Sequence, residues 1–100
     1  MAEIGMLGAG SWGTALTFEL SNRGHHVTVW SIAQDEVDML NSEHEQKVKL
    51  PGVKLPAEVQ ATTDLQRVIE GKDLLVLAVP SPFTRSTARS MKPFVRENQL

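Results

Sequence analysis

The sequence contains no cysteine, which excludes disulfide bonds and thiolate metal sites. It has no long apolar run, and the longest one, 74–80, is far too short to span a bilayer. No basic segment followed by an apolar stretch opens the chain, so we predict no secretory signal. Neither sign of charge dominates, because the net charge is −2 at pH 7, and we expect neither nucleic acid nor a membrane as a partner. These absences predict a soluble, cytoplasmic domain.

The rest of the composition is that of an ordinary globular protein. Hydrophobic residues make up 41% of the chain and charged residues 22%, and 100 residues are enough for one small domain with a core. The three histidines, His25, His26 and His44, lack the spacing of metal ligands. We therefore predict no metal site and assign no catalytic role to any of them.

Strand-like and helix-like segments alternate along the chain. Apolar and β-branched runs predict four strands, over 4–7, 27–30, 59–61 and 74–79. Apolar spacing and capping residues predict four helices, over 11–23, 35–41, 63–71 and 81–91. Trp12, Ala15, Leu16 and Leu20 mark the apolar positions of the first helix, and Thr63 is the expected cap of the third.

This alternation predicts an α/β fold with a parallel sheet covered by helices on both faces. Right-handed crossovers give a doubly wound, Rossmann-like sheet in strand order 3-2-1-4, which is the first βαβαβ half plus one further strand and helix. Between the second helix and the third strand, the polar segment 41–59 is expected to be a long surface connection, since it carries Pro51-Gly52 and Pro56.

Three glycines, Gly8, Gly10 and Gly13, form a G-x-G-x-x-G motif where the first strand meets the first helix. In this setting Gly8 allows a sharp turn, Gly10 leaves room for a pyrophosphate, and Gly13 lets the helix pack closely on the strand. The backbone N–H groups of Ser11 and Trp12 would then face the phosphates at the start of the helix. The alternative is a plain strand-to-helix turn, but the position of the motif favours a dinucleotide.

The end of the second strand should distinguish NAD from NADP. An acidic residue there binds the ribose 2′-hydroxyl of NAD, and a nearby arginine favours the 2′-phosphate of NADP. The sequence offers neither: Ser31, which could hydrogen-bond either form, is followed by Ile32. Asp35 and Glu36 come later and are expected to be helix-start residues. The choice between NAD and NADP stays open.

Two further groups of residues have weaker signals. Pro80 ends the fourth strand at the edge of the sheet where ligands bind, although a simple strand stop with a helix cap fits it slightly better. Three lysines, Lys47, Lys49 and Lys54, lie in the connecting segment and could reach a phosphate, but a solvated loop face is the favoured interpretation.

Five stretches of the sequence together resemble one enzyme family. They are GAGSWGTAL, NRGHHVTVW, LPGVKLP, ATTDL and LLVLAVPS, and they follow one another from residue 8 to residue 81. The likeness runs over nearly the whole chain, from Ile4 to about Pro93. In this order they resemble the N-terminal part of bacterial-type NAD(P)-dependent glycerol-3-phosphate dehydrogenase.

The resemblance implies reversible hydride transfer between NAD(P)H and dihydroxyacetone phosphate, which yields sn-glycerol 3-phosphate for phospholipid synthesis. It makes Gly8, Gly10, Ser11, Trp12, Gly13, Ser31, Ile32 and Pro80 the expected cofactor-binding residues. Ile32 stands where the family commonly has histidine or arginine, and Lys49 where tyrosine is common.

The resemblance also implies what lies outside these residues. The family's catalytic lysine, in a T-K-G motif, falls beyond Leu100, as does the helical substrate domain. Residues 1–100 are thus expected to form an incomplete NAD(P)-binding domain that is inactive alone, in a full-length protein that takes a small phosphorylated substrate and forms a homodimer. The alternatives are another NAD(P)-dependent dehydrogenase and a stand-alone, non-catalytic dinucleotide-binding module.

Overall fold

The structure is a computed structural model that describes residues 2–79, 87 and 89. Its central sheet has four parallel strands in the order β5-β2-β1-β6. The strands are β1 (Glu3–Leu7), β2 (His26–Trp30), β5 (Gln60–Thr62) and β6 (Leu74–Leu77). These are the four strands predicted from the sequence, in the predicted order 3-2-1-4, so the Rossmann-like fold class is confirmed. β6 ends two residues before the expected boundary.

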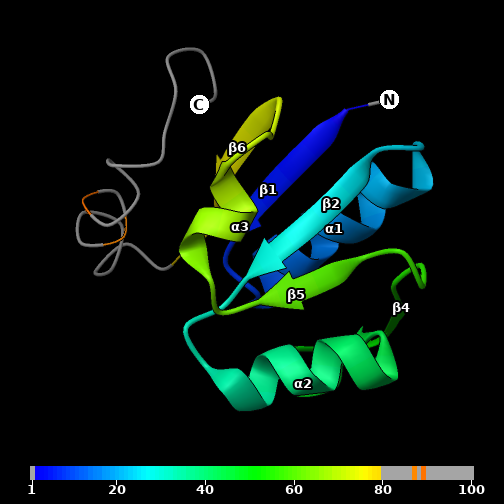
Figure 1. Cartoon of the computed structure of the whole chain (residues 1–100). Coiled ribbons are helices and arrows are strands. Elements are labelled where there is room, and N and C mark those ends of the chain that lie inside the picture. Colours follow the sequence, from blue (N-terminus) through cyan, green and yellow to red (C-terminus); the bar gives the residue numbers. More distant parts are fainter. Residues whose placement is uncertain (1, 80–86, 88, 90–100) are drawn as a thin grey trace.

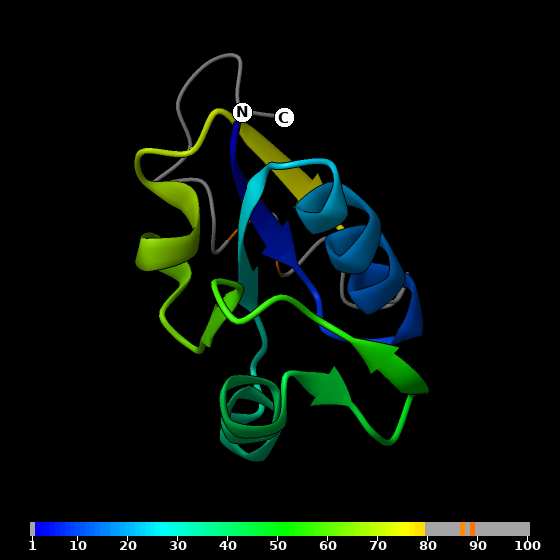
Figure 2. The same ribbon diagram turned by 90° about the vertical axis from the view of Figure 1, so that its right-hand side faces the viewer.

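Helices cover both faces of this sheet. α1 (Ser11–Asn22) lies on one face and α3 (Leu65–Ile69) on the other, while α2 (Gln34–Glu43) lies beyond the β5 edge (Figures 1 and 2). The helix predicted over 81–91 lies outside the described residues, except for Thr87 and Arg89, and so does Pro80. In the described part of the chain, no helix is long and apolar enough to cross a membrane.

Alternating side chains of β1 build the two halves of the core. Ile4 and Met6 face α1, whereas Leu7 packs with Val68 of α3 and Leu75 of β6. Ile4, Met6 and Leu7 are almost fully buried, and burial of each such side chain contributes about 1.5–3 kcal/mol. Because β1 is central and buried on both faces, its sequence shows no polar alternation.

Gly5 in the middle of β1 is explained by the packing of α3. A Cβ on this residue would lie 2.2 Å from the carbonyl oxygen of Val68 and 2.8 Å from Cδ2 of Leu75. Contacts this short do not occur in folded proteins, so only glycine lets the short helix approach the strand. A residue that lowers strand propensity is therefore required here by the close approach of another backbone.

The buried face of α1 differs from the predicted one. Leu16 and Leu20 do pack against the core, but Ala15 is exposed and Trp12 is 69% exposed. The residues buried in this helix are instead Gly13, Thr14 and Thr17. The helix lies so close to the turn after β1 that only small side chains fit at the contact. Both threonine hydroxyls donate to backbone carbonyls, Thr14 to Ala9 and Thr17 to Gly13.

The third helix also begins one residue later than predicted. Its N-cap is Asp64, whose Oδ1 accepts a hydrogen bond of 3.1 Å from the backbone N–H of Gln66. The expected cap, Thr63, instead accepts at its carbonyl oxygen a hydrogen bond from the Trp30 indole. The helix therefore uses a carboxylate, the stronger partner for the positive end of a helix.

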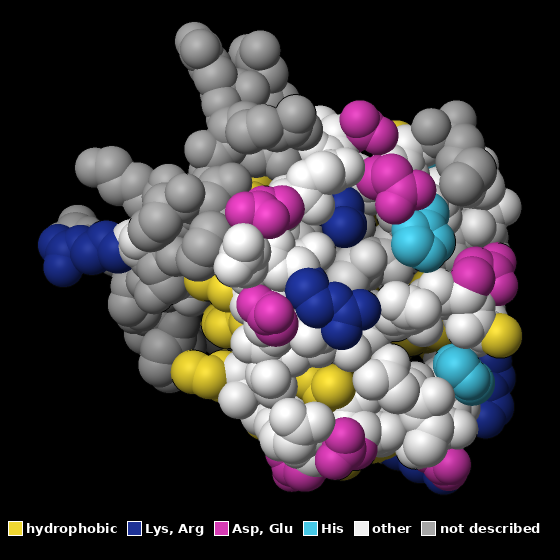
Figure 3. All heavy atoms as spheres, viewed as in Figure 1, with side chains coloured by type: hydrophobic (Ala, Val, Ile, Leu, Met, Phe, Trp, Pro, Cys, Tyr) yellow, Lys and Arg dark blue, Asp and Glu magenta, His cyan; other side chains and the backbone are white. Residues whose placement is uncertain are grey.

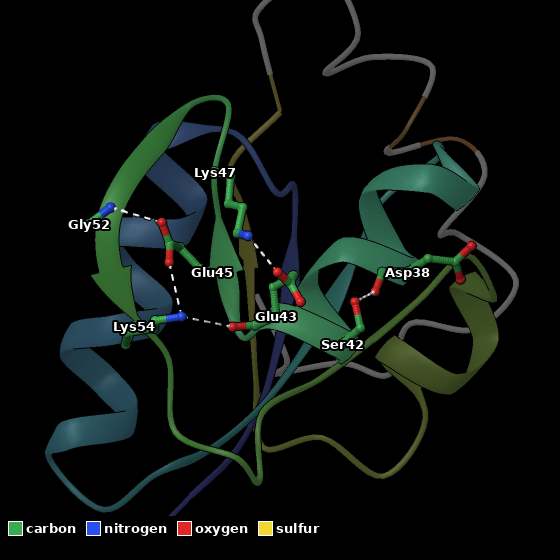
Figure 4. A network of polar contacts seen from close by, with 7 residues as sticks. All are labelled: Asp38, Ser42, Glu43, Glu45, Lys47, Gly52 and Lys54. Atoms are coloured by element: carbon green, nitrogen blue, oxygen red, sulfur yellow. Dashed lines mark hydrogen bonds and ion pairs between the residues drawn. The ribbon is translucent and has the colours of Figure 1, made fainter.

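A small antiparallel sheet replaces the long surface connection predicted over 41–59. It consists of β3 (Glu45–Gln46) and β4 (Leu50–Lys54) and is tied to the end of α2 by a polar network (Figure 4). Glu43 pairs with Lys47. Glu45 accepts a hydrogen bond from the Gly52 N–H at 3.1 Å and forms an ion pair with Lys54 Nζ at 3.1 Å. The prediction of an irregular connection was wrong. The small sheet is held largely by charged residues, so its strands show no apolar periodicity in the sequence.

The network lowers the pKa of two carboxyl groups, those of Glu43 and Glu45. The hydrogen bond from Lys47 lowers the pKa of the Glu43 carboxyl below its ordinary value of 4.5. The Gly52 N–H, followed by Lys54, lowers the pKa of Glu45 in the same way.

Elsewhere on the surface, acidic and basic side chains are interspersed on the face shown in Figure 3.

Candidate functional site

A pocket of about 310 Å³ lies where β1, β2 and β6 end. This is the carboxyl edge of a parallel sheet, the edge at which open α/β sheets bind their ligands. Apart from Thr87, the lining residues come from the ends of the strands, the start of α1, the first turn of α2 and the β3–β4 segment. They are Gly8, Ala9, Gly10, Trp30, Ser31, Ile32, Glu36, Lys49, Ala78, Val79 and Thr87.

Gly8 makes the sharp turn that leads from β1 into the pocket. Its φ of +132° is a conformation that residues with a side chain rarely adopt, and its N–H donates to the Trp30 carbonyl at 3.0 Å. A Cβ here would lie 2.5 Å from the carbonyl oxygen of Ala78. The turn thus keeps the ends of β1, β2 and β6 in contact.

Gly10 has open space above it, unlike Gly8. A Cβ on Gly10 would meet only Cδ of Lys49, at 3.9 Å, and its φ of −73° suits any residue. The glycine is therefore not required by the packing of the chain itself. It leaves free a space directly beside the first N–H groups of α1, which have no partner within a helix.

Gly13 lies beneath this space and holds the helix against the turn. A Cβ at Gly13 would lie 2.2 Å from the carbonyl oxygen of Gly8. Gly10 is the N-cap of α1, and no side chain caps the helix. An uncapped helix start with the positive end of the helix dipole behind it can accept an anion.

Only some of the predicted site residues line the pocket. It brings Gly8, Gly10, Ser31 and Ile32 into the pocket lining, while Gly13 is buried under the turn. Ser11 and Trp12 begin α1 next to Gly10, and their side chains point to solvent. Pro80 lies outside the described residues.

Ser31 is buried and its hydroxyl already has partners. Its Oγ donates to Oε1 of Glu36 at 2.6 Å and accepts from the Ala33 N–H at 3.1 Å. Its backbone N–H donates to the Thr62 carbonyl of β5 at 3.2 Å. The hydroxyl that the sequence offered for a ribose therefore serves to hold a carboxylate.

Glu36 and Lys49 also line the pocket, although the sequence favoured a helix start for Glu36 and a solvated position for Lys49. Glu36 lies in the first turn of α2, as expected, but its side chain is only 15% exposed and its Oε2 lies 3.2 Å from Lys49 Nζ. Lys49, expected to be solvated, is about half exposed. No sequence signal joins two residues 13 positions apart across a hairpin that the sequence did not predict.

Gln46 connects these residues to the glycine turn. This fully buried side chain donates from Nε2 to the Ala9 carbonyl at 2.6 Å and to Oε2 of Glu36 at 2.8 Å. The small sheet thereby positions the lining of the pocket. Within residues 2–79 together with 87 and 89, no group of three or more His, Cys, Asp or Glu side chains could hold a metal ion.

Comparison with known proteins identifies the family. The family described as "NAD-dependent glycerol-3-phosphate dehydrogenase N-terminus" matches residues 3–100. The glycerol-3-phosphate dehydrogenase (NAD(P)+) of Agathobacter rectalis is 56% identical over 100 residues, and that of Bacillus subtilis is 40% identical over 100 residues. The chain is covered completely in both matches, and it spans only about 30% of the length of these curated relatives.

The solved structures agree with this result. The crystal structure of glycerol-3-phosphate dehydrogenase from Coxiella burnetii has a TM-score of 0.91 and 35% sequence identity. The match covers 98% of this chain and 30% of that one. With the glycine turn, the parallel sheet and the family match in agreement, this chain belongs to the N-terminal, NAD-binding domain family of the NAD(P)-dependent glycerol-3-phosphate dehydrogenases.

Proposed function

We propose that the pocket binds NAD or NADP with the pyrophosphate over Gly10. The observation that carries this proposal is the open space above Gly10. The packing of the chain would tolerate a larger residue at this position. The space adjoins the uncapped start of α1, where N–H groups and the helix dipole favour an anion. Backbone atoms can approach the phosphates here because no Cβ stands in the way.

The site residues divide into four proposed roles. Gly8 and Gly13 shape the turn, and the N–H groups of Ser11 and Trp12 donate to phosphate oxygens. Ser31 and Ile32 line the end of the pocket that takes the adenosine ribose, as expected from their place after β2. Pro80, which follows β6 in the AVPS motif, is proposed to border the cofactor on the strength of the family resemblance.

The intact protein is proposed to be a glycerol-3-phosphate dehydrogenase. Residues 1–100 would form its NAD(P)-binding domain, and the reaction would be reversible reduction of dihydroxyacetone phosphate to sn-glycerol 3-phosphate for glycerophospholipid synthesis. The names and identities of the relatives support this assignment. We further propose a homodimer in the cytoplasm, as the resemblance to the family suggests.

The residues described here contribute binding and orientation. A bound nicotinamide supplies the hydride, and the protein supplies its position and electrostatic surroundings. The glycine turn orients the dinucleotide along the carboxyl edge of the sheet, since Gly8, Gly10 and Ala78 all line one pocket. The groups that bind the phosphorylated substrate and donate its proton are proposed to lie in sequence beyond Leu100, because the chain spans about 30% of the length of its relatives.

The test is NADH and NADPH oxidation by the intact protein, followed at 340 nm. We expect oxidation that requires dihydroxyacetone phosphate, and its reversal with sn-glycerol 3-phosphate and NAD(P)+. Oxidation that proceeds with a 2-oxoacid but not with dihydroxyacetone phosphate would assign the domain to another dehydrogenase. Saturable cofactor binding without any turnover would instead indicate a binding module.

A further inference from the structure

Four side chains from separate segments meet at the end of the pocket next to Ile32. Ser31 follows β2, Glu36 belongs to α2, and Gln46 and Lys49 come from the hairpin segment. Both carboxylate oxygens of Glu36 are engaged: Oε1 by Ser31, and Oε2 by Gln46 and Lys49. Because Ser31 and Gln46 are buried, the negative charge of Glu36 is fixed in place.

Lys49 carries the one positive charge among the described lining residues of the pocket. Its Nζ lies 3.2 Å from Oε2 of Glu36, so its charge is already paired. Ile32, which is 85% exposed, offers an apolar side chain instead of a second cation. A group entering here meets an apolar surface, a fixed carboxylate and a neutralised lysine.

NAD and NADP differ at this point by a phosphate on the ribose. A phosphate monoester carries a charge of about −1.5 to −2 at pH 7, whereas the 2′-hydroxyl of NAD is neutral. A phosphate would be repelled by Glu36 and would compete with that carboxylate for Lys49. A hydroxyl has no such cost and can donate to a carboxylate.

We propose that the Glu36–Lys49 ion pair makes this pocket select NAD(H) over NADP(H). The inference rests on the proposed function, because it requires that a dinucleotide occupies the pocket with its ribose near Ile32. Glu36 then supplies from the first turn of α2 the acidic charge that other dinucleotide-binding folds place at the end of the second strand. Ser31 and Gln46 act as positioning residues for that charge.

The experiment compares NADH and NADPH binding to the intact protein by isothermal titration. Glu36→Gln removes the charge and releases Lys49, while Lys49→Gln leaves the carboxylate without its cation. We expect Glu36→Gln to tighten NADPH binding roughly tenfold with NADH changed less than about twofold, and Lys49→Gln to weaken NADPH relative to NADH by a similar factor. The two halves of one ion pair thus move the NADPH:NADH ratio in opposite directions.

Asp38→Asn is the matched control, since it removes a carboxylate from the exposed face of the same helix. We expect this variant to leave the ratio unchanged. A merely structural ion pair would shift the ratio in the same direction in Glu36→Gln and Lys49→Gln, or not at all, and either result would overturn the proposal. Wild-type protein that binds NADPH as tightly as NADH would also overturn it, whereas failure to bind either dinucleotide would refute the proposed function itself.

Discussion

Gly5→Ala should destabilise the protein although alanine is the better strand residue. The added Cβ would stand 2.2 Å from a backbone oxygen of Val68 and 2.8 Å from Leu75. The backbone oxygen belongs to α3, which must move as a whole to relieve the contact, so overpacking at the upper end of about 1–3 kcal/mol is expected. Alanine restores up to about 1 kcal/mol by restricting the unfolded chain. The net loss is therefore about 2 kcal/mol.

Urea unfolding, with native-state hydrogen exchange read at the β1 amides, measures this loss. Gly10→Ala is the matched control, because the same methyl group there meets only Lys49 Cδ at 3.9 Å. We expect the control to change the free energy of unfolding by less than about 1 kcal/mol. Equal stabilities of the two variants would show that α3 does not press on β1 as described.

Two further predictions concern the small sheet and α3. Glu43 and Glu45 have lowered pKa values, so their stabilising contribution is complete above the ordinary value of 4.5 and is lost as the pH falls through their lower folded-state values. The Leu55 amide donates to His44, and its opening free energy, obtained from hydrogen exchange after correction for the intrinsic exchange rate, should fall over that acidic range. Glu45→Gln should reduce this dependence, and a pH-independent opening free energy would contradict it. Asp64→Ala should cost about 1 kcal/mol through loss of the α3 cap, measured by urea unfolding, while Thr63→Ala should cost clearly less. Equal losses in the two variants would argue against Asp64 as the cap.

The central sheet could be predicted because its strands are buried on both faces. Segments such as 74–79 are continuously apolar, and glycines follow where helices must end or turns must form, so local pattern and tertiary structure agree. The strand order follows from right-handed crossovers. The inner face of α1 could not be predicted in the same way, because close approach to the turn selects Gly13 and Thr17 by size and not by polarity.

The candidate site could be predicted only where backbone geometry determines it. Gly8 and Gly13 are required by packing, and the proposed role of Gly10 also depends on the absence of a side chain, so all three are visible in the spacing of glycines. The contact between Glu36 and Lys49 depends on the β3–β4 hairpin, which the ion pair of Glu45 with Lys54 stabilises. Charged pairs of this kind produce no periodic pattern in the sequence. The pairing of Glu36 with Lys49 at this end of the pocket could therefore be found only in the structure.

An isothermal titration of NADH into the intact wild-type protein and its Gly10→Val variant tests the proposed seat of the pyrophosphate. Ala15→Val, which adds two methyl groups to the exposed face of the same helix, is the control. We expect saturable binding to wild type and to the control, and binding weaker by at least about tenfold in Gly10→Val, because the side chain fills the space beside the helix N–H groups. Unchanged affinity in a folded Gly10→Val protein would contradict a dinucleotide seated over Gly10.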